Sequence, residues 1–157
     1  MSNKNYYKED MGYKFYGAGT KKVKPISDIF ASIEDQYHLY RLLSSLWSRE
    51  TCAPRMREKW SEDNITLGQC SITAFLVQDI FGGEVYGISL GDGSFHYFNR
   101  IGDVEFDLTS EQFGDKHLDY QSAIPQRRED HFAKKEKSER YKILKAALIE
   151  KLSAASI

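Results

Sequence analysis

An apolar run from Cys70 to Phe81 most constrains how this chain can fold. Gly68 precedes the run and Gly82-Gly83 follows it. Because apolar residues occupy nearly every position, the pattern predicts a helix buried on most sides and ended by the two glycines. A buried helix needs other elements packed around it, so this one is expected at the centre of the domain.

After the glycines the hydrophobic period changes to two, which is typical of strands. We expect strands over 84–90, 94–101 and 104–108, joined by turns at Gly91-Asp92-Gly93 and Gly102-Asp103. The result is an antiparallel meander. The expected fold is therefore α+β, with the helix headed by Cys70 packed on this meander.

Further helices are expected on both sides of this unit. Residues 33–48 carry apolar side chains at three- and four-residue spacing, and residues 129–152 do the same with Tyr141, Leu144, Leu148 and Leu152. The charged face of the last helix is interpreted as solvated. Residues 48–67 read as an ordered connection around Trp60, and Thr109 with Gln112 has the spacing of a capping box for a short turn.

Length and composition indicate one domain. The chain has 157 residues, of which 41% are hydrophobic. Residues 1–25 are lysine-rich and show no period, so they are interpreted as a flexible arm before a single domain over 26–157. The net charge of −1 provides no global field for nucleic acid or an anionic membrane. Without a membrane-length apolar run or a signal-peptide core, a cytoplasmic protein without a membrane partner is expected.

Cys70 lies where a helix begins, and the helix dipole there favours a thiolate. His96 and Asp107 follow in the predicted strands. Cysteine, histidine and carboxylate are the parts of an activated thiol nucleophile. A reducing compartment would keep Cys52 and Cys70 as thiols, although a bond between them stays geometrically possible.

The predicted register brings His96 and Asp107 together. If Gly102-Asp103 is a two-residue loop, Asp107 lies opposite Phe98 and projects on the same face as His96, with Cβ atoms about 7–8 Å apart. A slip of one residue would place the two side chains on opposite faces. Glu105 shares this face and is an alternative orienting acid.

The cysteine at a helix start, followed by a histidine and an acid on an antiparallel sheet, resembles the papain-like superfamily of peptidases, transglutaminases, deamidases and N-acyltransferases. A closer resemblance, to the YunG-type family of small bacterial proteins, covers roughly residues 33–152. It is carried by Glu50-Thr51-Cys52, the run Trp60 to Cys70, Thr73-Ala74, Gln78-Asp79, Gly82-Gly83, His96-Tyr97, Asn99-Arg100, Asp107-Leu108-Thr109, Glu111-Gln112-Phe113 and Arg140-Tyr141-Lys142-Ile143-Leu144.

On chemical grounds, Cys70 would be the nucleophile, His96 its base and then the acid for the leaving group, and Asp107 the group that orients the imidazole. Papain-like peptidases usually place a glutamine upstream of the cysteine to bind the oxyanion, and Asn64 stands at that position here. Gln69 or Asn64 could therefore donate to the oxyanion, together with the Cys70 backbone N–H. Asn99 and Arg100 could hold a substrate carboxylate or carbonyl, or lie on an exposed face.

The leading hypothesis is a cysteine hydrolase or acyl-transfer enzyme that forms a thioester on Cys70 and acts on a peptide, protein or small amide or acyl substrate. The alternative is a papain-like domain used only for binding or regulation. No cofactor is expected, and a metal site of Cys70, His96 and Asp107 would lack a fourth ligand. The other histidines, His38, His117 and His131, are expected to face solvent.

Overall fold

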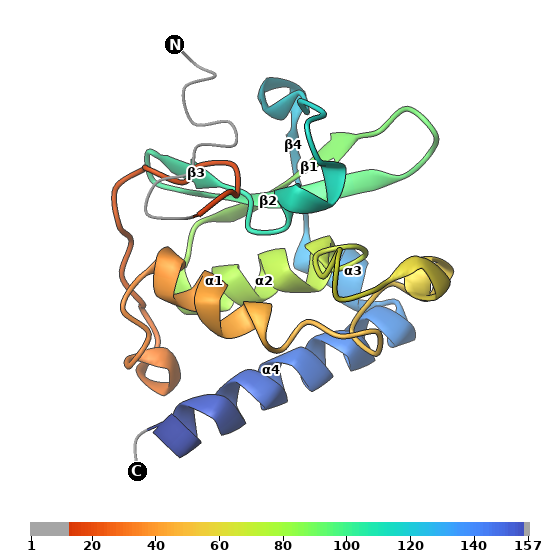
Figure 1. The fold of residues 1–157 in the computed structure, drawn as a ribbon. Helices are drawn as coiled ribbons and strands as arrows, with labels where there is room; N and C mark the ends of the chain where they lie inside the picture. The colour runs from red at the N-terminus through yellow and green to blue at the C-terminus, as the bar shows by residue number, and fades with distance from the viewer. Residues whose placement is uncertain (1–12, 156–157) are drawn as a thin grey trace.

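A computed structural model describes residues 13–155 as a sheet packed on layers of helices. Figure 1 shows the sheet above α1 and α2, with α4 beneath them. The strands are all antiparallel, in the order β3-β2-β1-β4. In chain order the elements are α1 (Gln36–Ser44), α2 (Cys70–Phe81), β1 (Glu84–Ser89), β2 (Phe95–Ile101), β3 (Val104–Phe106), β4 (Ile124–Pro125), α3 (Arg128–Phe132) and α4 (Lys135–Ala155). The α+β prediction is confirmed.

Helix α2 is the centre of this arrangement. It packs against β2 on one side and α4 on the other, and Phe75, Leu76 and Ile80 are fully buried. It ends at Gly82, whose φ of 85° lies in the left-handed region that favours glycine. The predicted buried helix and its end at the glycines are therefore confirmed. As a buried helix, α2 is a rigid support for its first residue, Cys70.

The sheet register follows from the turn at Gly102-Asp103. Ile101 pairs with Val104 and Asn99 with Phe106, as the two-residue loop predicts. Strand β3 is shorter than the predicted 104–108, because Asp107 leaves it to form an isolated bridge with Tyr16. Asn99 on β2 donates to the Ala74 carbonyl of α2, whereas Phe98, on the opposite face, packs with Tyr16 and Tyr120 in a second cluster.

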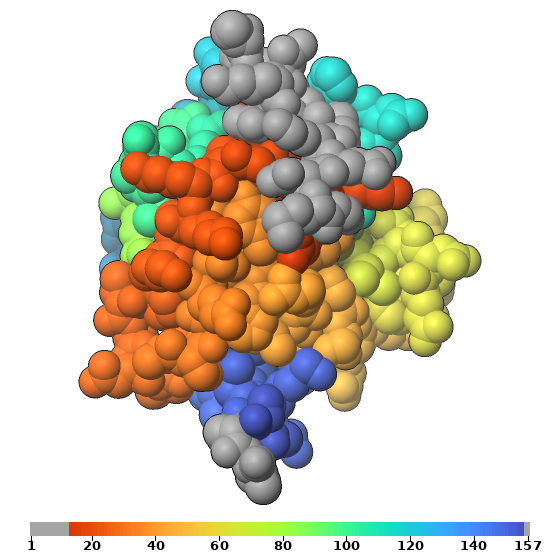
Figure 2. All heavy atoms as spheres, turned by 60° about the vertical axis from the view of Figure 1, so that its left-hand side comes forward, coloured from red at the N-terminus to blue at the C-terminus, as the bar shows by residue number. Residues whose placement is uncertain are grey.

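Residues 13–25 are not a flexible arm. Tyr13, Phe15, Tyr16 and Val23 are buried, and Tyr16 stacks on Tyr120 with ring centroids 3.7 Å apart. The segment passes so close to β3 that a Cβ on Gly17 would lie 2.5 Å from the Glu105 carbonyl oxygen. Figure 2 shows its red residues lying on the surface of the domain.

The arm prediction failed because this segment packs as irregular chain, and irregular chain has no hydrophobic period to detect. The backbone N–H of Tyr16 donates to Ser110 Oγ, and its carbonyl accepts from the N–H of Asp107. The packed domain therefore includes residues 13–25, and the rest of the predicted arm, residues 1–12, lies outside the described residues.

Other boundaries differ from the predictions in instructive ways. Helix α1 starts later than residue 33 because the Asp35 carboxylate caps it, accepting from the N–H groups of Tyr37 and His38. The predicted last helix is two helices, α3 and α4, and Pro125 lies in the short edge strand β4, where a missing N–H is tolerated. None of the helices between residues 13 and 155 is long and apolar enough to span a membrane.

Candidate active site

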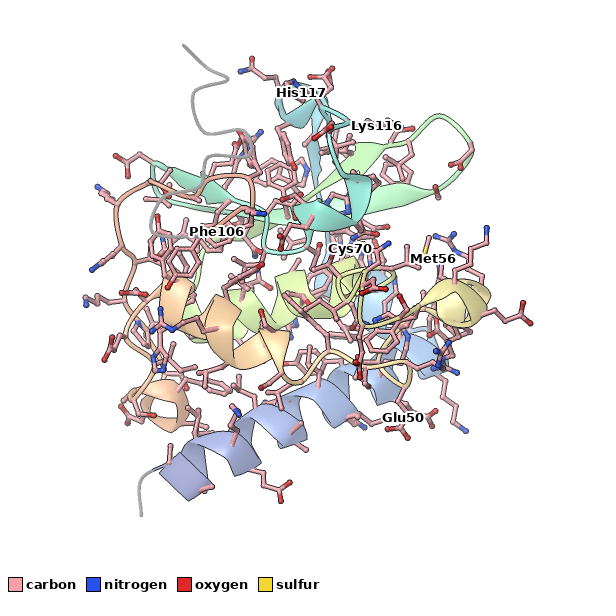
Figure 3. All side chains as sticks on the ribbon, viewed as in Figure 1. Glu50, Met56, Cys70, Phe106, Lys116 and His117 are labelled. Carbon is pink, nitrogen blue, oxygen red and sulfur yellow. The ribbon has the colours of Figure 1, made fainter. Side chains whose placement is uncertain are left out.

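Cys70 is the first residue of α2, and the turn before it is built around a glycine. Gly68 has φ +71°, and a Cβ there would lie 2.5 Å from the Cys52 sulfur, so a larger residue would displace the turn. No side chain caps the start of α2. The first-turn N–H groups of α2 therefore have no side-chain cap at the helix end where Cys70 stands. Figure 3 shows Cys70 at the end of α2 that faces the segment carrying Met56.

His96 and Asp107 form the buried half of the site. His96 Nε2 lies 2.6 Å from Asp107 Oδ2, and each residue is only 1% exposed. The diagonal contact predicted from the register is thus present. Glu105, the alternative acid, contacts Arg100 and Tyr16. The structure therefore pairs His96 with Asp107.

Asp107 is itself held by several donors. Tyr120 donates its hydroxyl hydrogen to Asp107 Oδ2 at 2.7 Å, and the backbone N–H of Thr109 donates to Oδ1 at 3.2 Å. The edge of the Phe113 ring meets the His96 ring at a centroid distance of 4.7 Å. These contacts fix the carboxylate and the imidazole plane, as an orienting acid requires.

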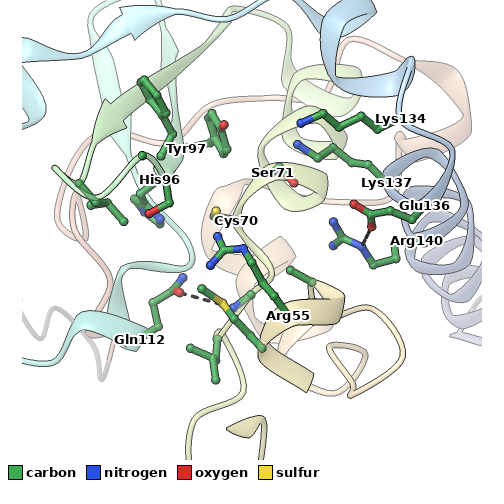
Figure 4. Close-up of a pocket in the computed structure, with 18 of the residues that line it drawn as sticks. Arg55, Cys70, Ser71, His96, Tyr97, Gln112, Lys134, Glu136, Lys137 and Arg140 are labelled. Atoms are coloured by element: carbon green, nitrogen blue, oxygen red, sulfur yellow. Dashed lines mark hydrogen bonds and ion pairs between the residues drawn. The ribbon is translucent and has the colours of Figure 1, made fainter. Parts of the chain in front are cut away.

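The second ring nitrogen of His96, Nδ1, is available to the Cys70 sulfur. Nδ1 is buried and has no hydrogen-bond partner that meets the usual distance and angle limits among the described residues. Because Asp107 occupies Nε2, Nδ1 is the nitrogen left for Cys70. Figure 4 shows His96 beside Cys70 in the cleft. The chain thus offers a thiol, an imidazole and a carboxylate in series.

The electrostatics of the pair favour the charged forms. Burial alone would raise the pKa of the Cys70 thiol, but the positive charge of His96, with a smaller contribution from the Tyr97 backbone, outweighs it and lowers that pKa. Burial likewise opposes a charged His96, yet Asp107 and Cys70 raise its pKa to about 10. A thiolate beside an imidazolium is therefore expected near neutral pH.

Cys70 opens into a cleft of ≈ 460 Å³. Its walls come from segments far apart in sequence (Figure 4): the start of α2, the strand residues Phe95–Tyr97, the turn residues Gln112 and Phe113, the segment around Arg55 and Met56, and the chain from Lys134 to Arg140. The residue Cys70 is partly exposed, whereas Cys52 is buried, and both cysteines are free. A substrate can therefore reach Cys70.

Several lining residues were not anticipated. Lys137 was assigned to the solvated face of the last helix, but it is only 8% exposed and lines the cleft with Lys134 and Arg140. His131, expected to face solvent, is 6% exposed and contacts Lys137. The break between α3 and α4 turns these residues inward, and the uniformly charged sequence there carries no signal that could have located them.

The four residues predicted to contact substrate or oxyanion lie elsewhere. Gln69 is buried, accepts from the Thr51 hydroxyl and donates to the Ser48 carbonyl. Asn99 donates to the Ala74 carbonyl. Arg100 contacts Glu105 and the Tyr120 carbonyl on the outer face of the sheet. Neither these residues nor Asn64 is among the described residues that line the cleft.

The side-chain amides of Gln69 and Asn99 therefore support α2 and the turn before it. The Cys70 backbone N–H remains as the predicted oxyanion donor. Within residues 13–155, no group of three or more His, Cys, Asp or Glu is arranged to hold a metal ion.

Comparisons with known proteins place the chain in a family. Residues 35–153 match the family model described as YunG protein. A protein of Bacillus subtilis (strain 168), named "Uncharacterized protein YunG", is 35% identical over 119 residues, which are 76% of this chain and 96% of that protein. No solved structure matches the chain significantly. Since the matched region contains α1, α2, the whole sheet and nearly all of α4, we conclude that the chain belongs to the YunG family.

Proposed function

We propose that this protein is a cysteine-dependent hydrolase or acyl-transfer enzyme with a papain-like arrangement of Cys70, His96 and Asp107. The observation that carries the proposal is the buried His96 ring, with Nε2 held by Asp107 and Nδ1 left for the thiol of Cys70. An imidazole oriented in this way by a carboxylate is the usual means of activating a thiol nucleophile.

The proposed reaction begins with the Cys70 thiolate attacking the carbonyl carbon of an amide or thioester. The carbonyl oxygen becomes an oxyanion, and the Cys70 backbone N–H at the start of α2 supplies a donor for it. Imidazolium His96 then protonates the leaving amine or thiol as the carbonyl re-forms. This step leaves the acyl group on Cys70 as a thioester and His96 neutral.

Neutral His96 next accepts a proton from the acyl acceptor. Water attacks the thioester carbonyl, the carbon–sulfur bond breaks, and the acid is released while the thiolate and imidazolium re-form. An amine in place of water would give transfer. Asp107 stays ionised throughout and stabilises the imidazolium, as its contacts with Tyr120 and Thr109 support.

An activated ester tests the proposal without knowledge of the natural substrate. Mixing the protein with p-nitrophenyl acetate should release a burst of about one equivalent of p-nitrophenolate per chain as the acetyl group moves to Cys70. Mass spectrometry of the quenched protein should locate that acetyl group. Cys70→Ser should remove the burst and the adduct on residue 70.

The matched control is Cys52→Ser, which removes the other thiol and should keep the burst. Equal acetylation of both cysteines, or a burst that survives Cys70→Ser, would contradict the proposal. Either result would favour the alternative hypothesis, a papain-like domain that binds a partner without catalysis.

A further inference from the structure

Positive charge dominates the cleft beside Cys70. Arg55, Lys134, Lys137 and Arg140 line it, and Glu136 is the one acid among its described lining residues. Glu136 is already engaged, because it accepts from Arg140 Nε at 2.7 Å. Arg55, Lys134 and Lys137 therefore remain uncompensated within the cleft. The net charge of the whole chain is only −1, so this concentration of cations is local.

Lys137 is the buried member of this group. Its side chain projects from the first turn of α4 towards Tyr97, as Figure 4 shows, and its ammonium lies 5.5 Å from the Tyr97 ring centroid. One of its N–H groups donates to His131 Nδ1 at 2.9 Å. No carboxylate pairs with Lys137 among the described residues, so two of its three donors are left for the cleft.

The contacts of His131 fix this lysine in place. His131 Nε2 lies 3.0 Å from Gln126 Oε1, which assigns the ring hydrogen to Nε2 and leaves Nδ1 as the acceptor for Lys137. Burial and the nearby lysines lower the pKa of His131 to about 4, which keeps the ring neutral. Gln126 and His131 thus hold the Lys137 ammonium against the cleft. A solvated surface lysine has no such fixed position.

A buried ammonium whose hydrogen-bond partner is a neutral histidine is costly, because desolvation disfavours its charge. Burial lowers the pKa of Lys137 to about 8, in accord with that cost. An anion in the cleft would offset the cost by accepting the unused N–H groups in charge-assisted hydrogen bonds. Arg55 and Lys134, both exposed, stand beside the same space and would attract such a group from solvent.

We propose that the substrate carries a carboxylate, which binds Lys137 with the help of Arg55 and Lys134 while its scissile carbonyl reaches Cys70. This inference rests on the proposed function for the reacting carbonyl and adds the class of substrate. It selects amides or thioesters with a carboxylate near the scissile bond, supplied either by an acidic side chain or by the free end of a peptide. Neutral acyl groups leave the ammonium unsatisfied.

Two alkylating agents of similar size test the charge preference. Iodoacetate carries a carboxylate and iodoacetamide does not, so the ratio of their rates at Cys70 reports the anion site. Lys137→Gln should lower this ratio on the order of tenfold, the effect of one charge-assisted hydrogen bond. Because Lys137 is buried and its replacement could disturb the fold, Arg55→Gln and Lys134→Gln are measured as well and should each lower the ratio several-fold.

Lys135→Gln is the matched control, since it removes the same charge from an exposed neighbour that does not line the cleft. It should leave the ratio unchanged. A ratio that stays constant in Arg55→Gln, Lys134→Gln and a folded Lys137→Gln variant would overturn the anion site. A ratio that falls equally in Lys135→Gln would also overturn it, because the effect would then be a long-range field.

A binding experiment separates this inference from the proposed catalysis. In Cys70→Ser, NMR titration compares N-acetylglutamine, which has only the terminal carboxylate, with N-acetylglutamate α-amide, which has only the side-chain carboxylate. The neutral N-acetylglutamine α-amide is the reference. At least one anion should bind on the order of tenfold more tightly than the reference and lose that advantage in Lys137→Gln. The tighter of the two identifies the source of the carboxylate.

Equal weak binding of all three compounds would overturn the carboxylate preference even if Cys70 is reactive. Conversely, an unreactive Cys70 with selective anion binding would contradict the proposed catalysis and leave the anion site supported.

Discussion

Cys52 and Cys70 both lie near positive charges, but the pKa values of their thiols shift in opposite directions. Cys52 is fully buried, and burial raises the pKa of its thiol even though Arg140, Arg57, Arg49 and Arg55 all act to lower it. Cys70 is partly exposed, and the pKa of its thiol is lowered, chiefly by the charge of the single His96 ring. Four cations at a distance thus do less than one imidazole in contact.

The difference shows what makes a thiol reactive in this fold. Near Cys52, Arg57 and Arg140 donate to backbone carbonyls, whereas His96 is anchored by Asp107 and has a nitrogen left for the Cys70 sulfur. Direct contact and an open cleft, rather than a basic neighbourhood, distinguish the two sites.

The difference in reactivity between Cys70 and Cys52 should increase as the pH falls. Because the pKa of Cys70 is lowered and that of Cys52 is raised, Cys70 keeps its thiolate at a pH where Cys52 is protonated. An ordinary thiol with a pKa near 8.5 is only about 0.1% thiolate at pH 5.5, and the thiolate fraction of Cys70 should fall less, so the ratio of the iodoacetamide rate at Cys70 to that at Cys52 should rise as the pH falls from 8.5 to 5.5.

Peptide mapping of timed samples measures the two rates in one reaction. The groups facing Cys70 that set its profile are His96, Asp107, Tyr97 and Lys137. A ratio that does not change between pH 5.5 and 8.5 would contradict a lowered Cys70 pKa.

Removing the imidazole should make Cys70 resemble an ordinary thiol. At pH 6.5, His96→Ala should slow the iodoacetamide reaction of Cys70 by up to about 10²-fold, because the thiolate fraction would fall towards that of a free cysteine, about 1% at this pH. The rate at Cys52 should not change. The measurement is again peptide mapping, with circular dichroism to verify the fold.

His117→Ala is the matched control for that substitution, because His117 is exposed and lies far from Cys70 in Figure 3. Its Cys70 rate should equal that of the wild type. If His96→Ala reacted as fast as the wild type, the activated thiol would have to be attributed to the helix start alone.

Gly68 connects the two regions, and its replacement should destabilise the domain. Gly68→Ala would place a Cβ 2.5 Å from the Cys52 sulfur at a backbone φ of +71°. We expect a loss of about 2–3 kcal/mol in the free energy of unfolding, combining strain and overpacking. Urea denaturation measures it.

Gly93→Ala separates the two contributions. Gly93 has φ +90° with nothing within 4 Å of the added Cβ, so only the backbone cost of about 1 kcal/mol applies. Equal losses in the two variants would mean that the Gly68 turn can relax away from Cys52.

The smallest effect is expected from the orienting acid. Asp107→Asn keeps the size of the side chain but removes the charge that stabilises imidazolium His96, so the Cys70 alkylation rate at pH 6.5 should fall about tenfold. Glu105→Gln, a change on the same face without contact to His96, should have no effect on that rate. A larger loss in Glu105→Gln than in Asp107→Asn would reverse the assignment of the acid.

The candidate triad could be predicted from sequence because Cys70 and His96 lie in regular elements and Asp107 directly follows one, at the end of β3. The apolar run and the glycines located α2, and the two-residue loop set the register that joins His96 to Asp107. These features repeat within short, contiguous segments, so their period can be recognised.

The oxyanion candidates failed for a related reason. A polar residue next to a nucleophile looks available in sequence, but Gln69 and Asn99 satisfy backbone and hydroxyl groups that the packing of α2 would otherwise leave unpaired. Whether an amide is free depends on its neighbours in space, and sequence spacing does not list them.

The amino-acid sequence by itself determined the central helix, the meander, the register and the pairing of His96 with Asp107. Tertiary structure decided that Tyr16 pairs with the Asp107 backbone, that Tyr120 donates to its carboxylate, that His131 is buried, and that Lys137 shares the cleft with Cys70. Local elements follow from side-chain periodicity and turn geometry within a few residues. The cleft instead joins five separated segments, whose meeting depends on the packing of the whole core.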